Sequence, residues 1–254
     1  MQIRVLGCSG GIGGDLRTTS LLLDDDILID AGTGVGDLSI DEMVAIDHVF
    51  LTHSHLDHVA FVPLMMDTLI GMREKPVTLH ATRETWQMLQ EHIFNWKIWP
   101  DFSIIPHEHD PFLRYSEIRV GEAVHLDGRS ITPLPVKHVV PSVAFRIDSG
   151  AASLVFSGDT TNCDALWEAV NEIDNLKYLV IETAFGNAEL RLARLSGHLC
   201  PSLLVEELDK LRRPATIYIT HLKPGEGDEI MRQIAATAPA FNPLPLLQGQ
   251  VFEF

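Results

Sequence analysis

Short runs of apolar residues recur along the whole chain and alternate with turns and with longer amphipathic stretches. Runs of this length, bounded by glycine or polar residues, are typical of buried strands. Several of the longer stretches begin with a helix-start signal, such as Thr82 as a capping residue or Pro201 in a first turn. The expected strands cover residues 3–6, 20–23, 27–30, 49–51, 77–80, 131–137, 143–147, 154–157, 178–181 and 217–220, and the expected helices cover residues 59–70, 83–94, 164–173, 201–212 and 226–236. This alternation predicts a layered α/β fold. No internal repeat, low-complexity segment or linker interrupts it, so we expect one domain over residues 1–254.

Histidine or carboxylate side chains directly follow many of these expected strands. They are the cluster at residues 53–58, His138, Asp159, Glu182 and His221. Any one of them alone could be a structural residue. Strand ends are where layered α/β folds build their sites, and burying so many polar groups together would be too costly without a cation. Their shared placement therefore predicts one site with more than one metal ion.

The densest part of this pattern is the stretch from Thr52 to His58, which lies between an expected strand and an expected helix. In extended chain, residues two apart point the same way, so His53 and His55 can bind one ion together. Asp57 and His58 begin the helix and can turn towards a second ion. Imidazole nitrogens with a carboxylate suit zinc, iron or manganese. Asp30, at the end of an earlier strand, is expected to support this loop from behind.

The glycine-rich loop at residues 7–14 has neither the Gly-Lys-Ser/Thr ending of a P-loop nor the following helix of a dinucleotide-binding motif. We expect it to let backbone approach the site or simply to turn the chain.

A second unusual loop contains Asn95, Trp96 and Trp99. Its tryptophans either pack in the core or form a platform on which a flat ligand such as a nucleobase stacks. A polar loop with His107 and His109 is expected at the surface.

Composition narrows the possible partners. A chain of 254 residues with 46% hydrophobic residues can bury a core without disulfide bonds, and its three cysteines form no C-x-x-C pair. The formal net charge of −16 opposes binding to nucleic acid or anionic membranes. No apolar run approaches the roughly 18–20 residues of a membrane span, and the N-terminus lacks a signal-peptide core. A cytoplasmic protein is therefore expected. The sequence is compatible with a homodimer but has no feature that indicates one.

The motifs at the strand ends resemble those of the metallo-β-lactamase superfamily, and most closely those of its class II cyclic-nucleotide phosphodiesterases. The superfamily signature H-x-H-x-D-H is met at residues 53–58. Its later ligands follow in the expected order as His138, Asp159 and His221. The narrower family is suggested by the segments 95–100, 197–201 and 219–224. Cys200 departs from the pattern, since a hydroxyl residue is expected there.

This resemblance implies a four-layered αββα sandwich with two divalent metal ions at one rim. Zinc is the expected metal, with manganese and iron as alternatives. One ion would be held by His53, His55 and His138, the other by Asp57, His58 and His221, with Asp159 bridging them.

The resemblance also implies an activity: hydrolysis of a 3′,5′-cyclic nucleotide, cyclic AMP or cyclic GMP, to the nucleoside 5′-monophosphate by a metal-bridging hydroxide. Asp57, His198 and Glu182 are the expected catalytic residues. His198, oriented by Glu182, would give a proton to the leaving 3′ oxygen or bind the phosphate. Asn95, Trp96, Trp99 and His198 are expected to contact the substrate.

Two other functions are considered. A tRNA 3′-processing endoribonuclease has similar ligands but needs a basic arm, and no insertion rich in lysine or arginine is present. A non-catalytic metalloprotein that binds a nucleotide without turnover is the other alternative.

Overall fold

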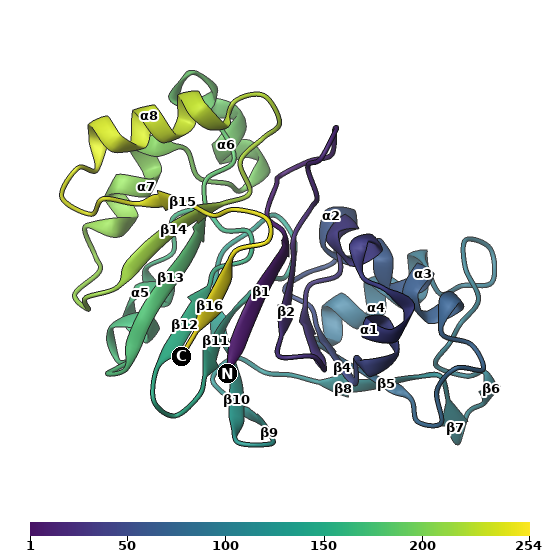
Figure 1. Cartoon of the computed structure of the whole chain (residues 1–254). Coiled ribbons are helices and arrows are strands. Elements are labelled where there is room, and N and C mark those ends of the chain that lie inside the picture. The colour runs from purple at the N-terminus through teal and green to yellow at the C-terminus, as the bar shows by residue number, and fades with distance from the viewer.

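Two seven-stranded β-sheets form the centre of the molecule (Figure 1). The computed structural model describes residues 1–254. The first sheet contains, in spatial order, β16 (Val251–Glu253), β1 (Gln2–Gly7), β2 (Ser20–Leu23), β3 (Ile27–Ile29), β4 (His48–Phe50), β5 (Val77–Ala81) and β8 (Leu113–Glu117). The second contains β15 (Leu244–Pro245), β14 (Thr216–Thr220), β13 (Leu176–Glu182), β12 (Ser153–Phe156), β11 (Val143–Asp148), β10 (Arg129–Pro135) and β9 (Val124–Leu126). A separate hairpin pairs β6 (Pro106–His107) with β7 (Asp110–Pro111).

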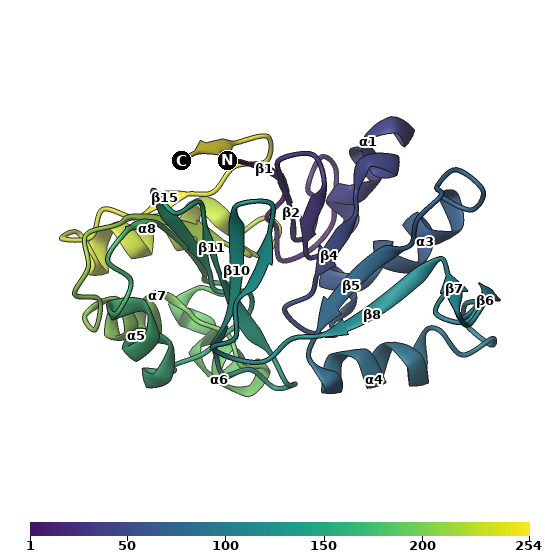
Figure 2. The same cartoon turned by 90° about the horizontal axis from the view of Figure 1, so that it is seen from below.

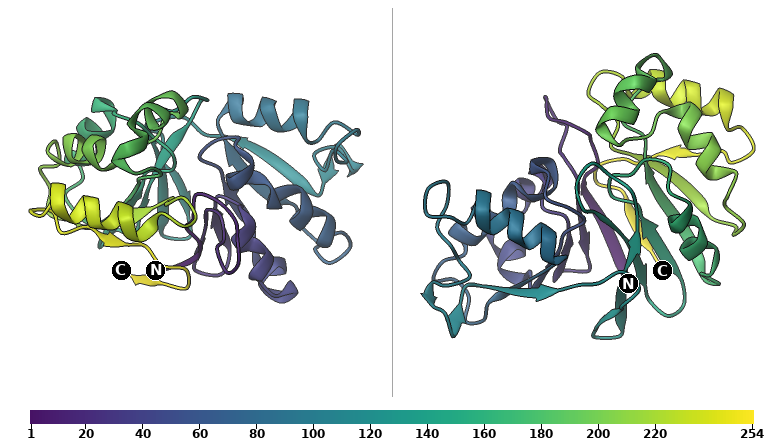
Figure 3. Two further views of the ribbon diagram at one scale, coloured as in Figure 1. Left: turned by 90° about the horizontal axis from the view of Figure 1, so that it is seen from above. Right: turned by 180° about the vertical axis from the view of Figure 1, so that it is seen from behind.

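Helices cover the outer face of each sheet (Figures 2 and 3). The helices beside the first sheet are η1 (Thr33–Asp37), α1 (Ile40–Ala45), α2 (Leu56–Val59), α3 (Phe61–Thr68) and α4 (Arg83–His92). Those beside the second are α5 (Asp164–Asn171), η2 (Asn187–Glu189), α6 (Leu190–Ser196), α7 (Pro201–Leu208) and α8 (Gly227–Thr237). None of them is both long enough and apolar enough to cross a membrane.

Three hydrophobic clusters hold these layers together. The central cluster joins the inner faces of the two sheets, with Phe50 of β4 against Phe145 of β11 at 5.8 Å between ring centroids. A second cluster lies between the first sheet and α3 and α4, and a third lies between the second sheet and α5, α7 and α8. Because each sheet buries both faces, its inner strands are apolar throughout, as in Ile27–Ile29. The layer order is helix, sheet, sheet, helix, so the predicted αββα architecture is confirmed.

Strand direction explains why the site forms at one edge. In the first sheet β3, β4, β5 and β8 run parallel, and in the second β12, β13, β14 and β15 run parallel. Strand β10 is antiparallel to β11, which is antiparallel to β12, so β10 ends at the same edge as β12. The residues after β4, β10, β12, β13 and β14 therefore meet above the two sheets.

The expected elements all form, with shifted ends. The helix expected over residues 59–70 is two helices, and it starts earlier, at Leu56. The series of helical backbone hydrogen bonds is interrupted because the Phe61 amide donates to Ala31 O instead of to a carbonyl of the preceding turn. The helix expected to reach residue 212 ends at Leu208. Elements not expected from the sequence include α1, α6, β8 and the C-terminal strand β16, which pairs with β1 and brings the two termini together (Figure 1).

Candidate metal centre

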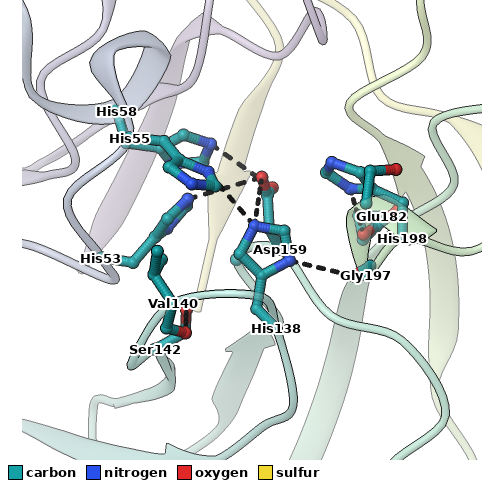
Figure 4. A network of polar contacts seen from close by, with 12 residues as sticks. His53, His55, His58, His138, Val140, Ser142, Asp159, Glu182, Gly197 and His198 are labelled. Carbon is teal, nitrogen blue, oxygen red and sulfur yellow. Dashed lines mark hydrogen bonds and ion pairs between the residues drawn. The ribbon is translucent and has the colours of Figure 1, made fainter. Parts of the chain in front are cut away.

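The seven side chains predicted as metal ligands come together at this edge. Figure 4 labels His53, His55, His58, His138 and Asp159 among them. Four of them follow β4, one follows β10, one follows β12 and one follows β14. In this order they are His53, His55, Asp57 and His58, then His138, then Asp159, then His221.

One group consists of His53, His55, His138 and Asp159, whose candidate ligand atoms all lie within 4.8 Å of one another. Asp159 Oδ2 is 3.5 Å from His53 Nε2 and 3.9 Å from His138 Nε2. His138 Nε2 is in turn 3.2 Å from His55 Nδ1. Ligands about 2.1 Å from a tetrahedral ion lie roughly 3.4 Å apart, so these separations fit one ion.

A second group consists of Asp57, His58 and His221. Asp57 Oδ2 is 3.7 Å from His221 Nε2 and 4.0 Å from His58 Nε2. The other oxygen of Asp159, Oδ1, is 3.3 Å from His58 Nε2 and 3.3 Å from His221 Nδ1. Asp159 thus presents one oxygen to each group, which is the arrangement that a bridging carboxylate requires.

Unpartnered polar atoms show that a cation fits here. His53 Nε2, His58 Nε2, Asp159 Oδ1 and both ring nitrogens of His221 are buried and have no hydrogen-bond partner. Buried polar atoms without a partner are rare because each costs roughly 1–3 kcal/mol. All of them belong to residues of the two ligand groups, so bound metal ions would satisfy His53 Nε2, His58 Nε2, Asp159 Oδ1 and one ring nitrogen of His221.

The protonation states also suit metal binding. Burial lowers the pKa of His53, His55 and His138, and it lowers the pKa of His221 to about 3. Neutral imidazole, the form that coordinates metals, is therefore favoured at these four residues. His58 differs, because burial acts to lower its pKa but the carboxylates of Asp159 and Asp30 outweigh burial and raise that pKa well above its ordinary value, so a metal ion there would displace a proton. Burial acts to raise the pKa of Asp159, but the neighbouring His221 and His58 outweigh it and hold that pKa well below its usual value. Asp159 is consequently an ionised carboxylate.

Asp30 and Thr52 orient two of the ligands from behind. Asp30 is fully buried, and its Oδ2 accepts from His58 Nδ1 at 2.7 Å. Thr52 donates its amide to Asp30 Oδ1 and its hydroxyl to Asp30 Oδ2, each at 2.8 Å. Since that hydroxyl is already donating, it accepts from His53 Nδ1 at 2.9 Å. Both rings are left with Nε2 facing the site. The supporting role predicted for Asp30 is confirmed, whereas Thr52 was not assigned a role from the sequence.

Replacing Asp30 with asparagine should weaken zinc binding by about 10- to 100-fold, because groups that orient metal ligands commonly contribute that much affinity. The affinity can be measured by competition with a chromogenic chelator. Asp41→Asn, an exposed carboxylate in α1, is the matched control and should leave zinc affinity unchanged. Equal affinities for Asp30→Asn and wild type would contradict an orienting role.

Close backbone packing completes the surroundings of the ligands. His138 Nδ1 donates to Gly197 O at 2.9 Å, and a side chain at Gly197 would contact that nitrogen at 3.0 Å. A side chain at Gly10, in the predicted glycine-rich loop, would lie 2.4 Å from His221 O. The glycine-rich loop therefore brings its backbone close to the site, which was one of the two expectations for this loop.

Glu182 and His198 form a buried pair beside the metal ligands (Figure 4). His198 Nδ1 donates to Glu182 Oε1 at 2.8 Å. The same carboxylate accepts from the amides of Thr160, at 3.0 Å, and Leu199, at 3.2 Å. Three donors fix the carboxylate and leave His198 Nε2 free. The His198 ring stacks on His221 at 5.2 Å between centroids, so it lies directly next to the second ligand group.

The Glu182 carboxylate also controls the charge of His198. Burial acts to lower the pKa of His198, but the charge and hydrogen bond of Glu182 outweigh it and raise that pKa above its ordinary value. The protonated ring is thereby favoured, and a protonated ring can both donate a proton and attract a phosphate.

The tryptophan loop lies elsewhere, so its predicted contact with the substrate is not supported. Helix α4 connects β5 to the parallel strand β8, and it therefore runs back from the site to the opposite edge of the sheet. The loop that contains Asn95, Trp96 and Trp99 connects the end of α4 to the β6–β7 hairpin, which lies at the lower right of Figure 1.

The structure accounts for this loop without a ligand. Asn95 Oδ1 accepts the amides of Lys97 and Ile98, and Trp99 packs against the core between the first sheet and its helices. Trp96 is exposed. The core-packing alternative is therefore correct for Trp99. His107 and His109, in the neighbouring hairpin, are exposed as expected.

Comparison with known proteins identifies the family. Residues 25–222 match the family described as "Beta-lactamase superfamily domain". The chain belongs to this superfamily. Its membership agrees with the H-x-H-x-D-H motif, and this fold, together with the ligand cluster, implies that divalent metal ions bind here.

Within the superfamily, two similar proteins are named cyclic-nucleotide phosphodiesterases, in agreement with the predicted resemblance. The chain is 24% identical to "Probable 3',5'-cyclic-nucleotide phosphodiesterase" of Yersinia pestis, over 92% of this chain and 82% of the relative. It is 25% identical to "3',5'-cyclic-nucleotide phosphodiesterase" of Aliivibrio fischeri, over 86% of this chain and 80% of the relative. A "Ribonuclease Z" of Mycobacterium bovis is 28% identical, over 61% of this chain and 59% of the relative.

Solved structures show the same fold. Unliganded yeast PDE1 has a TM-score of 0.83 at 19% identity, covering 100% of this chain and 99% of that one. The metallo-beta-lactamase fold protein YhfI of Bacillus subtilis has a TM-score of 0.77, also at 19% identity, covering 99% of each chain.

Proposed function

We propose that the protein hydrolyses 3′,5′-cyclic nucleotides to nucleoside 5′-monophosphates with two divalent ions, zinc being the first choice and manganese or iron the alternatives. The observation that carries the proposal is the Glu182–His198 pair placed beside the two ligand groups. A phosphodiester needs charge stabilisation at phosphorus and a proton for the departing oxygen, and this arrangement can provide both. The two phosphodiesterase relatives, which match most of the chain, give further support.

The ligand assignment proposed from the sequence fits this geometry. His53, His55 and His138 would hold one ion, Asp57, His58 and His221 would hold the other, and Asp159 would contact both. When bound, such ions lower the pKa of water and neutralise negative charge on the phosphate.

The chain's own residues then have distinct tasks. Asp57 is the least buried carboxylate of the cluster, with a side chain 30% exposed, so it can hydrogen-bond the water that attacks phosphorus. As the bond from phosphorus to the 3′ oxygen breaks, that oxygen takes the proton of His198 Nε2. Glu182 holds the ring in place and stabilises its charge. The product is a 5′-phosphate with a free 3′ hydroxyl. Binding of the phosphate by His198 without proton transfer is the other role considered for this residue.

RNA processing is the second candidate, because of the ribonuclease Z relatives. That match covers a smaller part of the chain than the phosphodiesterase matches do. The net charge of −16 also disfavours binding of a long polyanion. A small cyclic nucleotide, with a single phosphate, is far less affected by this charge.

The test is an assay of purified protein with cyclic AMP, cyclic GMP and a tRNA precursor. We expect turnover of at least one cyclic nucleotide, loss of turnover after chelation and dialysis, and recovery when zinc or manganese is added. Elemental analysis of the active protein should find about two ions per chain. Efficient cleavage of the precursor with both cyclic nucleotides untouched would reject this function in favour of RNA processing. Nucleotide binding without turnover would instead indicate a non-catalytic metalloprotein.

A further inference from the structure

His221 differs from other candidate metal ligands in the way its ring is held. The rings of His53, His58 and His138 are each oriented by a hydrogen bond at one nitrogen. Both ring nitrogens of His221 are buried without a hydrogen-bond partner. Its backbone also has a φ of 65°, in the left-handed region that non-glycine residues rarely adopt. The position of His221 must therefore be fixed by its backbone and by the groups packed against it.

The glycine-rich loop at residues 7–14 supplies these contacts. The His221 amide donates to Cys8 O at 2.8 Å, and the Gly10 amide donates to Leu222 O at 3.0 Å. Gly10 also lies directly against the ligand, since a side chain there would be 2.4 Å from His221 O and 3.0 Å from Cδ2 of its ring. The loop thus packs against both the backbone and the imidazole of His221.

Lys223, two residues after His221, ties the loop down. Its Nζ donates to Gly10 O at 2.7 Å and lies 5.7 Å from the centroid of the Phe185 ring. The amide and the carbonyl of Gly10 are therefore both bound to the two residues that follow the ligand. Residues 12–16, at the tip of the loop, are exposed. The contacts at its base, including that of Lys223, consequently decide where the loop lies.

We propose that Lys223 is a positioning residue, which holds the glycine-rich loop against His221 and thereby sets the metal affinity of the second ligand group. The inference rests on the two-ion part of the proposed function and is independent of the substrate. Groups that orient metal ligands commonly contribute about 10- to 100-fold in affinity. Because the backbone hydrogen bonds of Cys8 and Gly10 remain without Lys223, we expect the lower end, about tenfold, for one of the two ions.

The experiment measures the affinities of both zinc ions by competition between zinc-loaded protein and a chromogenic chelator. Lys223→Met should weaken one ion about tenfold and keep the other, whereas Lys223→Arg, which retains a charged donor, should keep most of the affinity. Lys177→Met is the matched control and should change neither ion. Lys177 Nζ also donates to a backbone carbonyl, that of Glu253 at 3.1 Å, and lies 5.0 Å from the centroid of the Tyr178 ring, but at the edge of the sheet opposite the ligands.

A second variant tests whether Lys223 acts through the loop. Gly10→Ala places a methyl group against His221 O, so it should weaken the same zinc ion while Lys223 is intact. The double variant of Lys223→Met and Gly10→Ala should then bind zinc about as well as Gly10→Ala alone, because residues that act through one contact are not additive. Gly186→Ala is the control, since its side chain would meet only Gln233, at 3.7 Å.

The outcomes separate this role from a structural one and from the proposed function. A lower melting temperature of Lys223→Met with both zinc affinities unchanged would show that Lys223 only stabilises the fold, and would overturn the proposal. Equal weakening of both ions, or fully additive losses in the double variant, would overturn it as well. In each of these cases the two-ion mechanism stands. A wild type that binds fewer than two zinc ions would instead reject that mechanism and the role of Lys223 together.

Discussion

Replacing Asp159 with alanine should lower turnover by roughly 10³-fold or more and release metal from the protein. Asp159 is the residue whose two oxygens face the two ligand groups, at 3.3 Å from His58 and His221 and 3.5 Å from His53. Its loss removes a ligand from both groups and the negative charge that balances the two cations. Metal content by elemental analysis and turnover of a cyclic nucleotide, measured on the same preparation, check this expectation.

The control for Asp159→Ala is Asp174→Ala, which removes a carboxylate that is 90% exposed and paired only with Arg213. This control should keep both metal content and rate, since exposed ion pairs contribute little. Circular dichroism of both variants shows whether the fold is retained. A folded Asp159→Ala that still binds two ions per chain and turns over substrate normally would contradict the bridging role.

The metal cluster could be predicted from the sequence because each ligand is marked by a local signal. A histidine or an aspartate follows an apolar strand, and parallel strands in one sheet end at the same edge. The spacing within residues 53–58 also places His53 and His55 on one side of the chain. Neither inference depends on knowing how the two sheets pack. The fold class followed from the same alternation of strands and helices.

The surroundings of the cluster could not be predicted in this way. Thr52 acts through Asp30, which is 22 positions away in the chain, and Gly197 acts on His138 across 59 positions. Such contacts depend on the packing of distant segments, and a threonine or glycine carries no distinguishing local pattern. Asp30 itself was found only because it too stands at a strand end.

The tryptophan loop shows where local reasoning failed. Two tryptophans beside a proline were compatible with core packing or with a stacking platform, but the direction of α4 decides their location. Since β5 and β8 are parallel, the helix between them must return to the starting edge, and whatever follows it lies away from the site. Strand β8 was not recognised in the sequence, so this crossover could not be seen.

Replacing His198 with alanine should lower turnover by about 10²- to 10⁴-fold while both metal ions stay bound, if His198 is the general acid. The expectation rests on its position: Glu182 occupies Nδ1 at 2.8 Å, and Nε2 is left for the substrate next to His221. Metal content and steady-state rates with a cyclic nucleotide give the two readouts. Glu182→Gln, which keeps the shape but removes the charge, should produce a smaller loss, because a neutral amide can still accept from Nδ1 but no longer favours the protonated ring.

A substrate that needs no acid separates the two possible roles of His198. For 4-nitrophenyl esters the leaving phenolate is stable without a proton, so His198→Ala should recover most of the lost rate if the ring acts as an acid. A ring that only binds phosphate would give a similar loss with both substrates, since the phosphate is common to them. Loss of metal from His198→Ala would show that this residue is a ligand instead, which its grouping with Asp159 and His221 allows geometrically. Full activity with both ions retained would remove His198 from the reaction, and the Glu182–His198 pair would then only stabilise the fold.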